Sequence, residues 1–185
     1  MGIYYKGEAF MTTVTIIAGG HKIDSRLTGI LQFAVDYLGK KNVAVHIIQV
    51  HQLPSAALIT ADFMNKDIIA ARQKVEQSNG VIVLSPVFQA SYSGIIKTFL
   101  DLLPQKSLRN KAILPLMLGG TIAHLLVMDY ALKPVLANLG ATNLLTGAYV
   151  TDNQIAKQDN QNYVLDIDSE ARITNQLDQL LEGIQ

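Results

Sequence analysis

The sequence of 185 residues contains no cysteine and no excess of charge of either sign. Without cysteine it can form no disulfide, no thiolate metal site and no cysteine nucleophile. Its 15 Lys and Arg balance its 15 Asp and Glu, so a basic surface that binds nucleic acid is not expected. The apolar fraction of 49% excludes a disordered chain and suffices for one domain with a sizeable core.

Signals for a membrane or an export route are also missing. No apolar run approaches the roughly 18 residues of a membrane span. The first residues lack the apolar core of a signal peptide, and Lys6 stands where a myristoylation motif needs Ser or Thr. We therefore expect a soluble cytoplasmic protein. We expect residues 1–12 to be an N-terminal extension, with Met11 as an alternative start, and residues 13–185 to form the domain.

Several enzyme signatures are absent as well. The chain has neither G-x-G-x-x-G nor the P-loop pattern G-x-x-x-x-G-K-[ST]. Its histidines show no H-E-x-x-H, and no G-x-S-x-G is present, which argues against metal and serine hydrolases. We expect no metal site. The acidic segment with Asp152, Asp159, Asp166 and Asp168 is predicted to be a solvated loop, because it lacks calcium-ligand spacing.

What the sequence does contain is an alternation of strands and helices. Apolar, β-branched runs predict strands at residues 13–18, 43–50, 81–84, 112–117 and 143–150. Helical patterns follow them at residues 25–39, 61–77, 93–103, 121–139 (interrupted near Pro134) and 169–181. This alternation implies right-handed βαβ units. We predict an α/β flavodoxin-like three-layer sandwich with a five-stranded parallel sheet in the order 2-1-3-4-5.

The segment LSPVFQASYSGIIKTFLDLLP at residues 84–104 is the most informative. Pro86 has a fixed φ and no N–H, so it is predicted to end the third strand and to leave the following amides facing a ligand. Phe88 offers an aromatic face to a flat ligand. Ser93, as N-cap, and Gly94 suit the start of a helix. Taken alone, these residues fit an ordinary βα loop with a core Phe equally well.

Two other loops lie at the same edge of the sheet in this topology. Open α/β sheets bind ligands at the carboxyl ends of their strands, where the strand order reverses. The loop at residues 19–28 opens a helix and supplies hydroxyls and cations, so we expect it to hold an anion such as a phosphate. A solvated helix cap is the alternative. The glycines at residues 119–120 would let backbone approach a ring, although such pairs usually mark a turn.

Two further strings accompany these loops, GGTIAHLL at residues 119–126 and DYALKPVL at residues 129–136. Together with residues 84–104 they resemble the NADPH-dependent FMN reductase family, in particular its sulfonate-type members. The resemblance runs from about residue 13 to the last helix. It implies that NADPH or NADH reduces FMN, and that FMNH2 is supplied to a partner monooxygenase that desulfonates alkanesulfonates.

The resemblance also implies which residues contact the flavin. Those expected at the ring and the ribityl chain are Pro86, Val87, Phe88 and Gln89, with Gly119, Gly120 and Thr121 at the other edge of the ring. Those expected at the phosphate are Gly20, Lys22, Ser25, Arg26, Leu27 and Thr28. No catalytic side chain is expected, because the hydride passes directly from the nicotinamide to the flavin.

Oligomeric state is implied in the same way. Dimers and tetramers are usual in the family, so we expect a homodimer or homotetramer formed through the helix from Thr121 to Leu139. A Tyr at the position of Tyr130 is associated there with a π-type bulge near the flavin and the interface. An ordinary packed aromatic residue is the alternative for Tyr130.

The first loop departs from the family pattern Gly-Ser-x-Arg, because this chain has Gly19-Gly20-His21-Lys22. A hydroxyl is absent at Gly20, and Lys22 binds phosphate as a point charge without the fork of arginine. Phe88 and Leu118 also replace hydroxyl-bearing residues that are common in the family. We therefore expect weaker FMN binding, which fits a reductase that releases its flavin and equally a site that has lost its function.

Two other functions stay open at this point. The first is an enzyme that retains FMN and passes electrons to quinones, azo dyes or metal ions. The second is a flavodoxin-like flavin-binding protein or electron carrier without turnover of pyridine nucleotides. The zero net charge argues mildly against a carrier, since many carriers dock through acidic faces.

Overall fold

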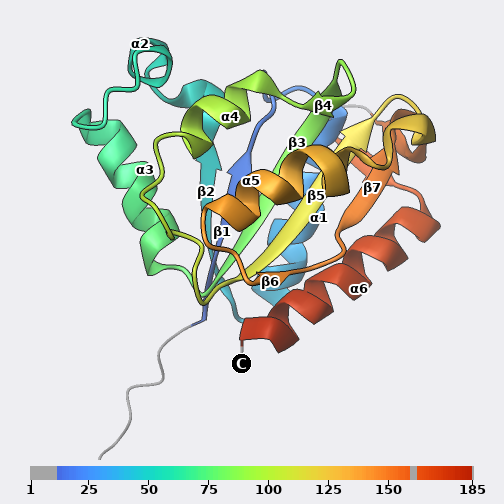
Figure 1. Cartoon of the computed structure of the whole chain (residues 1–185). Coiled ribbons are helices and arrows are strands. Elements are labelled where there is room, and N and C mark those ends of the chain that lie inside the picture. The colour runs from blue at the N-terminus through green and yellow to red at the C-terminus, as the bar shows by residue number, and fades with distance from the viewer. Residues whose placement is uncertain (1–11, 159–161, 185) are drawn as a thin grey trace, which may run out of the picture.

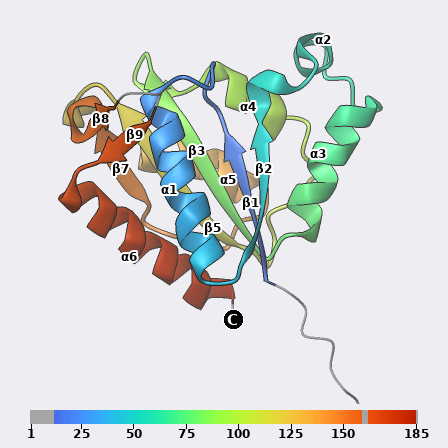
Figure 2. The ribbon, with the colours of Figure 1, turned by 180° about the vertical axis from the view of Figure 1, so that it is seen from behind.

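The computed structural model describes residues 12–158 and 162–184. They form three layers, with a parallel sheet between two layers of helices (Figure 1, Figure 2). Helices α1 (Arg26–Lys40) and α6 (Ile167–Ile184) cover one face of the sheet. The expected N-terminal extension at residues 1–12 lies outside the described residues, apart from residue 12.

The opposite face is covered by shorter helices, α3 (Lys66–Gln77), α4 (Gly94–Leu100) and α5 (Lys133–Asn138). A further short helix, α2 (Ser55–Ile59), precedes α3. No helix in the described part of the chain has the length and apolar character needed to cross a membrane.

The sheet has the predicted topology. Its members are β1 (Thr13–Ala18), β2 (Ala44–Gln49), β3 (Gly80–Phe88), β5 (Ala112–Gly119) and two short pieces, β6 (Asn143–Leu144) and β7 (Ala148–Thr151). The order is β2-β1-β3-β5-β6, with every neighbour parallel, and β7 pairs with β5 beyond β6. Because β6 and β7 together make the fifth strand, the flavodoxin-like order 2-1-3-4-5 is confirmed.

Alternation along the strands divides the core in two. In β3, Val81 and Val83 pack with α3, α4 and α5, whereas Ile82 and Leu84 pack with α1 and α6. All four side chains are 0–1% exposed. Successive side chains of a strand point to opposite faces, so a continuous apolar run is what a sheet covered on both sides requires.

The split of the fifth strand, which was predicted as one run, has a local cause in β5. Pro115 has no N–H to donate, and β6 and β7 pair with β5 on either side of it. Gly147 lies opposite with a φ of +87°, and a Cβ there would come within 2.5 Å of the Pro115 carbonyl oxygen. The Gly147 N–H donates instead to Oε1 of the buried Gln176, at 2.8 Å.

Two further predictions of element ends were wrong. Pro86 does not end the third strand: it still pairs with Leu118 of β5, and the chain then continues into a hairpin with β4 (Ser91–Tyr92). The helix expected at residues 61–77 begins only at Lys66, because the Asn65 side chain caps it by accepting from the amides of Asp67 and Ile68.

The predicted helix from Thr121 to Leu139 is three short pieces. They are a 3-10 turn at Ile122–His124, a π-helix at Met128–Leu132 and α5, with Pro134 in the first turn of α5. Near Pro134 the chain passes from the π-helix into α5 without leaving helical geometry, and the break in the predicted helix lies earlier, at the turn of residues 125–126. The π-helix contains Tyr130, as the resemblance implied.

The acidic segment after β7 is not a solvated loop. It forms a 3-10 turn at Asp152–Gln154 and an antiparallel hairpin of β8 (Ile155–Lys157) and β9 (Tyr163–Leu165). The hairpin packs on α1, where Tyr163 lies against Gly29 so closely that a Cβ at Gly29 would come within 2.7 Å of the Tyr163 Cβ. Asp159 lies outside the described residues.

Buried serine hydrogen bonds join the loops after β1 and β3. The Ser93 hydroxyl donates to the Gly19 carbonyl oxygen at 2.8 Å, rather than capping α4, and the Ser93 amide donates to Ser85 Oγ at 2.9 Å. Both serines are 0% exposed. These bonds fix the relative position of the two loops at the carboxyl edge of the sheet.

We expect Ser93→Ala to lower the free energy of unfolding by about 1–3 kcal/mol, because it leaves the buried Gly19 carbonyl without its donor. Urea unfolding followed by far-UV circular dichroism would measure the change. Ser91→Ala is the matched control, since Ser91 is partly exposed, and it should stay within about 0.5 kcal/mol of the unmodified protein. Equal effects of the two substitutions would contradict this role of Ser93.

Candidate functional site

A cavity of about 410 Å³ lies at the carboxyl ends of β1, β3 and β5. Its wall comes from four places: the loop before α1, the start of the β3–β4 hairpin, the end of β5 and the segment from the end of β7 to β9. The lining residues are Gly20, His21, Lys22, Asp24, Ser25, Arg26, Leu27, Pro86, Val87, Phe88, Leu118, Gly119, Gly120, Asp152, Lys157 and Tyr163.

Most of the residues expected at the site from the sequence line this one cavity. They are Gly20, Lys22, Ser25, Arg26, Leu27, Pro86, Val87, Phe88, Gly119 and Gly120. Thr28, Gln89 and Thr121 lie outside its wall. The Thr28 hydroxyl donates to the Ile23 carbonyl oxygen, and the Thr121 hydroxyl accepts from the Ala123 amide at 3.3 Å.

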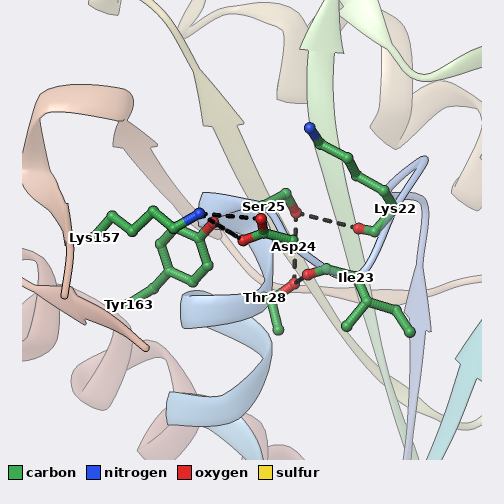
Figure 3. Close-up of polar contacts among 7 residues, drawn as sticks. All are labelled: Lys22, Ile23, Asp24, Ser25, Thr28, Lys157 and Tyr163. Atoms are coloured by element: carbon green, nitrogen blue, oxygen red, sulfur yellow. Dashed lines mark hydrogen bonds and ion pairs between the residues drawn. The ribbon is translucent and has the colours of Figure 1, made fainter. Parts of the chain in front are cut away.

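The first end of the cavity is the N-terminus of α1. Ser25 occupies the N-cap position without capping the helix by its side chain, and its hydroxyl instead lies 3.4 Å from the Lys22 carbonyl oxygen (Figure 3). The first amides of a helix have no partner within it and carry the positive end of the dipole. Lys22 and Arg26 add two cations, of which Arg26 is positioned by a 3.1 Å bond from its Nε to the Ile155 carbonyl oxygen.

A cluster centred on Asp24 joins this loop to the β8–β9 hairpin. Lys157 Nζ lies 3.0 Å from both carboxylate oxygens of Asp24, and the Tyr163 hydroxyl donates to the same carboxylate (Figure 3). The bond from Tyr163, followed by that from Lys157, lowers the pKa of Asp24, so Asp24 is ionised at neutral pH. Bonding to Asp24 raises the pKa values of Lys157 and Tyr163 in turn.

The second end of the cavity is apolar and partly open. Phe88 is 51% exposed, and the ring of His21 meets it edge to face at a centroid distance of 5.0 Å. The hairpin tip beyond Phe88 places Gln89 and Ala90 at φ values of +48° and +57°. Non-glycine residues in this region cost about 1–3 kcal/mol each, and such strain is typical of functional sites.

The two glycines at the end of β5, Gly119 within the strand and Gly120 directly after it, have different roles. A Cβ at Gly119 would come within 1.9 Å of the Tyr149 hydroxyl oxygen. That hydroxyl is held in place because it donates a hydrogen bond to the Thr121 carbonyl oxygen at 2.8 Å. Gly119 is therefore required by packing. At Gly120 the nearest atom to a Cβ would be Asp152 Oδ2, at 3.8 Å, so a small side chain fits there and a larger one would enter the cavity.

Sequence reasoning missed His21, Asp24, Asp152, Lys157 and Tyr163 as parts of the wall, and named Leu118 only as a departure from the family. Asp152 follows the fifth strand at the carboxyl edge of the sheet, a signal that was available. Lys157 and Tyr163 gave no such signal, because the hairpin that carries them was predicted as a loop. Among residues 12–158 and 162–184, no three His, Asp or Glu side chains are grouped so that they could hold a metal ion.

Comparison with known proteins identifies the family. Residues 12–156 match the NADPH-dependent FMN reductase family. The chain belongs to this family. It is 39% identical over 142 residues to an FMN reductase (NADPH) of Escherichia coli, and the aligned region covers 77% of this chain and 74% of that protein. The identity to an FMN reductase (NADPH) of Pseudomonas putida is 41% over 143 residues, 77% of this chain and 73% of that protein.

A solved structure with the same fold is the NADH:FMN oxidoreductase EMOB in its apo form. Its TM-score is 0.84 at 28% identity, over 95% of this chain and 91% of that chain. The expected FMN reductase family and its oxidoreductase class are thereby confirmed.

The cavity fits the phosphate and ring ends of an FMN. One end offers helix amides and cations to a phosphate, and the other offers backbone and an aromatic edge to a flat ring. At Gly120 no side chain covers the backbone of the cavity wall.

Proposed function

We propose that this FMN reductase binds FMN in the cavity, reduces it with NADPH or NADH and releases FMNH2 to a monooxygenase. The observation that carries the proposal is the placement of two unlike ends in one cavity: the N-terminus of α1 with its cations, and the open apolar end at Phe88. A phosphorylated flavin has the same polarity along its length.

At the anion end, α1 supplies amides and a dipole contribution of about 0.3–1 kcal/mol for an exposed site. Lys22 and Arg26 would supply the positive charge. Leu27 and Gly20 would contribute backbone, with Leu27 Cδ2 only 3.0 Å from where a Cβ at Gly20 would lie. Because Leu27 packs so closely there, a side chain at position 20 would have little room.

At the ring end, the chain's task would be orientation rather than proton transfer. A bound flavin would accept the hydride from the nicotinamide directly, so the transfer needs no protein acid or base, and the proton that completes FMNH2 would come from water. Pro86, Val87 and Phe88 would fix one edge of the ring, and Gly119 and Gly120 the other. Holding two rings at reacting distance is the main way in which such a site accelerates hydride transfer.

Release of FMNH2 to a monooxygenase rests on the family and on the open ring end. Relatives and structural neighbours carry names with both NADPH and NADH, so the proposal includes either donor. Desulfonation of an alkanesulfonate by the partner is inferred from the strings at residues 119–136 that resemble the sulfonate-type reductases.

We also propose a homodimer or homotetramer formed through residues 121–139. Ile122, Leu126 and Tyr130 on this segment are 60%, 59% and 79% exposed. Three large apolar side chains so close in sequence form a surface that a second copy of the chain would cover.

We expect Gly120→Asp to abolish FMN binding and FMN-dependent NADPH oxidation. Its carboxylate would enter the cavity beside Asp152 and exclude the ring. Gly120→Ala is the matched control, because the added Cβ meets no atom closer than 3.8 Å, and it should keep most of the activity. FMN titration by fluorescence and the rate of NADPH oxidation would test both variants, and wild-type affinity and rate in Gly120→Asp would contradict the site.

We expect Tyr130→Asp to reduce the mass of the particle in solution, because it places a charge on the proposed interface. Light scattering after size exclusion would measure the mass. Ile59→Asp is the control, since Ile59 on α2 is 77% exposed and lies outside the proposed interface. A monomeric unmodified protein, or an unchanged mass in Tyr130→Asp, would contradict the interface.

A further inference from the structure

The wall of the cavity holds two acidic residues, Asp24 and Asp152, and Asp24 lies beside the N-terminus of α1, where an anion would bind. Asp24 directly precedes Ser25, the N-cap residue of α1, and lines the same cavity as Lys22 and Arg26. The amides and dipole of the helix favour an anion at this end, whereas the ionised carboxylate opposes it. A cation from another part of the chain neutralises the negative charge of Asp24.

That cation comes from the β8–β9 hairpin. Lys157 holds both oxygens of the Asp24 carboxylate at 3.0 Å, across 133 residues of sequence, and Tyr163 donates to the same group. In Figure 3 the side chains of Lys157 and Tyr163 reach Asp24 from one side, and the Lys22 ammonium points elsewhere. Lys157 thus lines the cavity, but its ammonium group is paired with the Asp24 carboxylate.

The pair is exposed to water. The side chains of Lys157 and Asp24 are 49% and 39% exposed, and such pairs hold their partners weakly. A phosphate carries more negative charge than a carboxylate and offers more acceptor oxygens. A phosphate at the start of α1 would therefore compete with Asp24 for Lys157.

We propose, on the basis of the proposed function, that Lys157 is a phosphate-binding cation of this cavity and that Asp24 restrains it. Asp24 then lowers the affinity for FMN and favours its release, which suits a protein that treats FMN as a substrate. Asp24 is a positioning residue in this scheme, because it acts through Lys157. The alternative is that these bonds only hold the β8–β9 hairpin against the loop before α1 and have no role in binding the phosphate.

The test compares FMN with riboflavin, which lacks the phosphate. Asp24→Asn should tighten FMN binding roughly two- to fivefold, and Lys157→Gln should weaken it by a similar factor, with riboflavin affinity unchanged in both. Asp24→Asn should give a smaller gain in a chain that already carries Lys157→Gln, because only its direct repulsion of the phosphate is then removed. The effects should shrink as salt is raised from low to high ionic strength, because they are electrostatic.

Asp36→Asn is the control for net charge, because Asp36 lies exposed on α1 outside the cavity wall, and it should change neither affinity. Equal effects on FMN and riboflavin, or unchanged FMN affinity in Asp24→Asn or Lys157→Gln, would overturn the inference and leave a structural clasp. So would an undiminished gain from Asp24→Asn in the Lys157→Gln chain. An unmodified protein that binds no FMN would overturn the proposed function as well, so the two failures are distinguishable.

Discussion

The parallel pairing of β1, β3 and β5 is the constraint on which the rest of the structure depends. It brings the carboxyl ends of three strands to one edge, so loops that are far apart in the sequence form one cavity. The pairing alone does not fix the loops. The buried bonds from Ser93 to Gly19 and Ser85 do, because a broken hydrogen bond between buried groups is costly.

Some features of the cavity would favour the binding of a flavin phosphate, and others would weaken the binding of the flavin. Its helix N-terminus and cations favour an anion, but a carboxylate paired with Lys157 lies beside them. Its ring end is open at Phe88 and bordered by strained residues at the hairpin tip. Under the proposed function, a site built in this way would position a flavin for hydride transfer without holding it permanently.

Much of this was accessible from the sequence. Apolar runs and helical periods gave the strand order, and the position of each loop at a strand end placed most of the expected residues in one cavity. The failures have physical causes. The prediction that Pro86 ends a strand failed because its pairing with Leu118 of β5 depends on the tertiary arrangement. Lys157 was missed because polar hairpins lack the apolar alternation that reveals buried strands. Thr28 and Thr121 fell outside the wall because their hydroxyls bond to nearby backbone.

The most direct test of the central claim is an anaerobic titration of the purified protein with excess FMN, followed by NADPH and, separately, NADH. The long-wavelength absorbance band of the flavin reports its reduction. The account predicts that a catalytic amount of protein bleaches the band of the whole excess with at least one of the two donors, which requires repeated release of FMNH2. A band that stays unbleached with both donors, or bleaching limited to one flavin per protein, would contradict it.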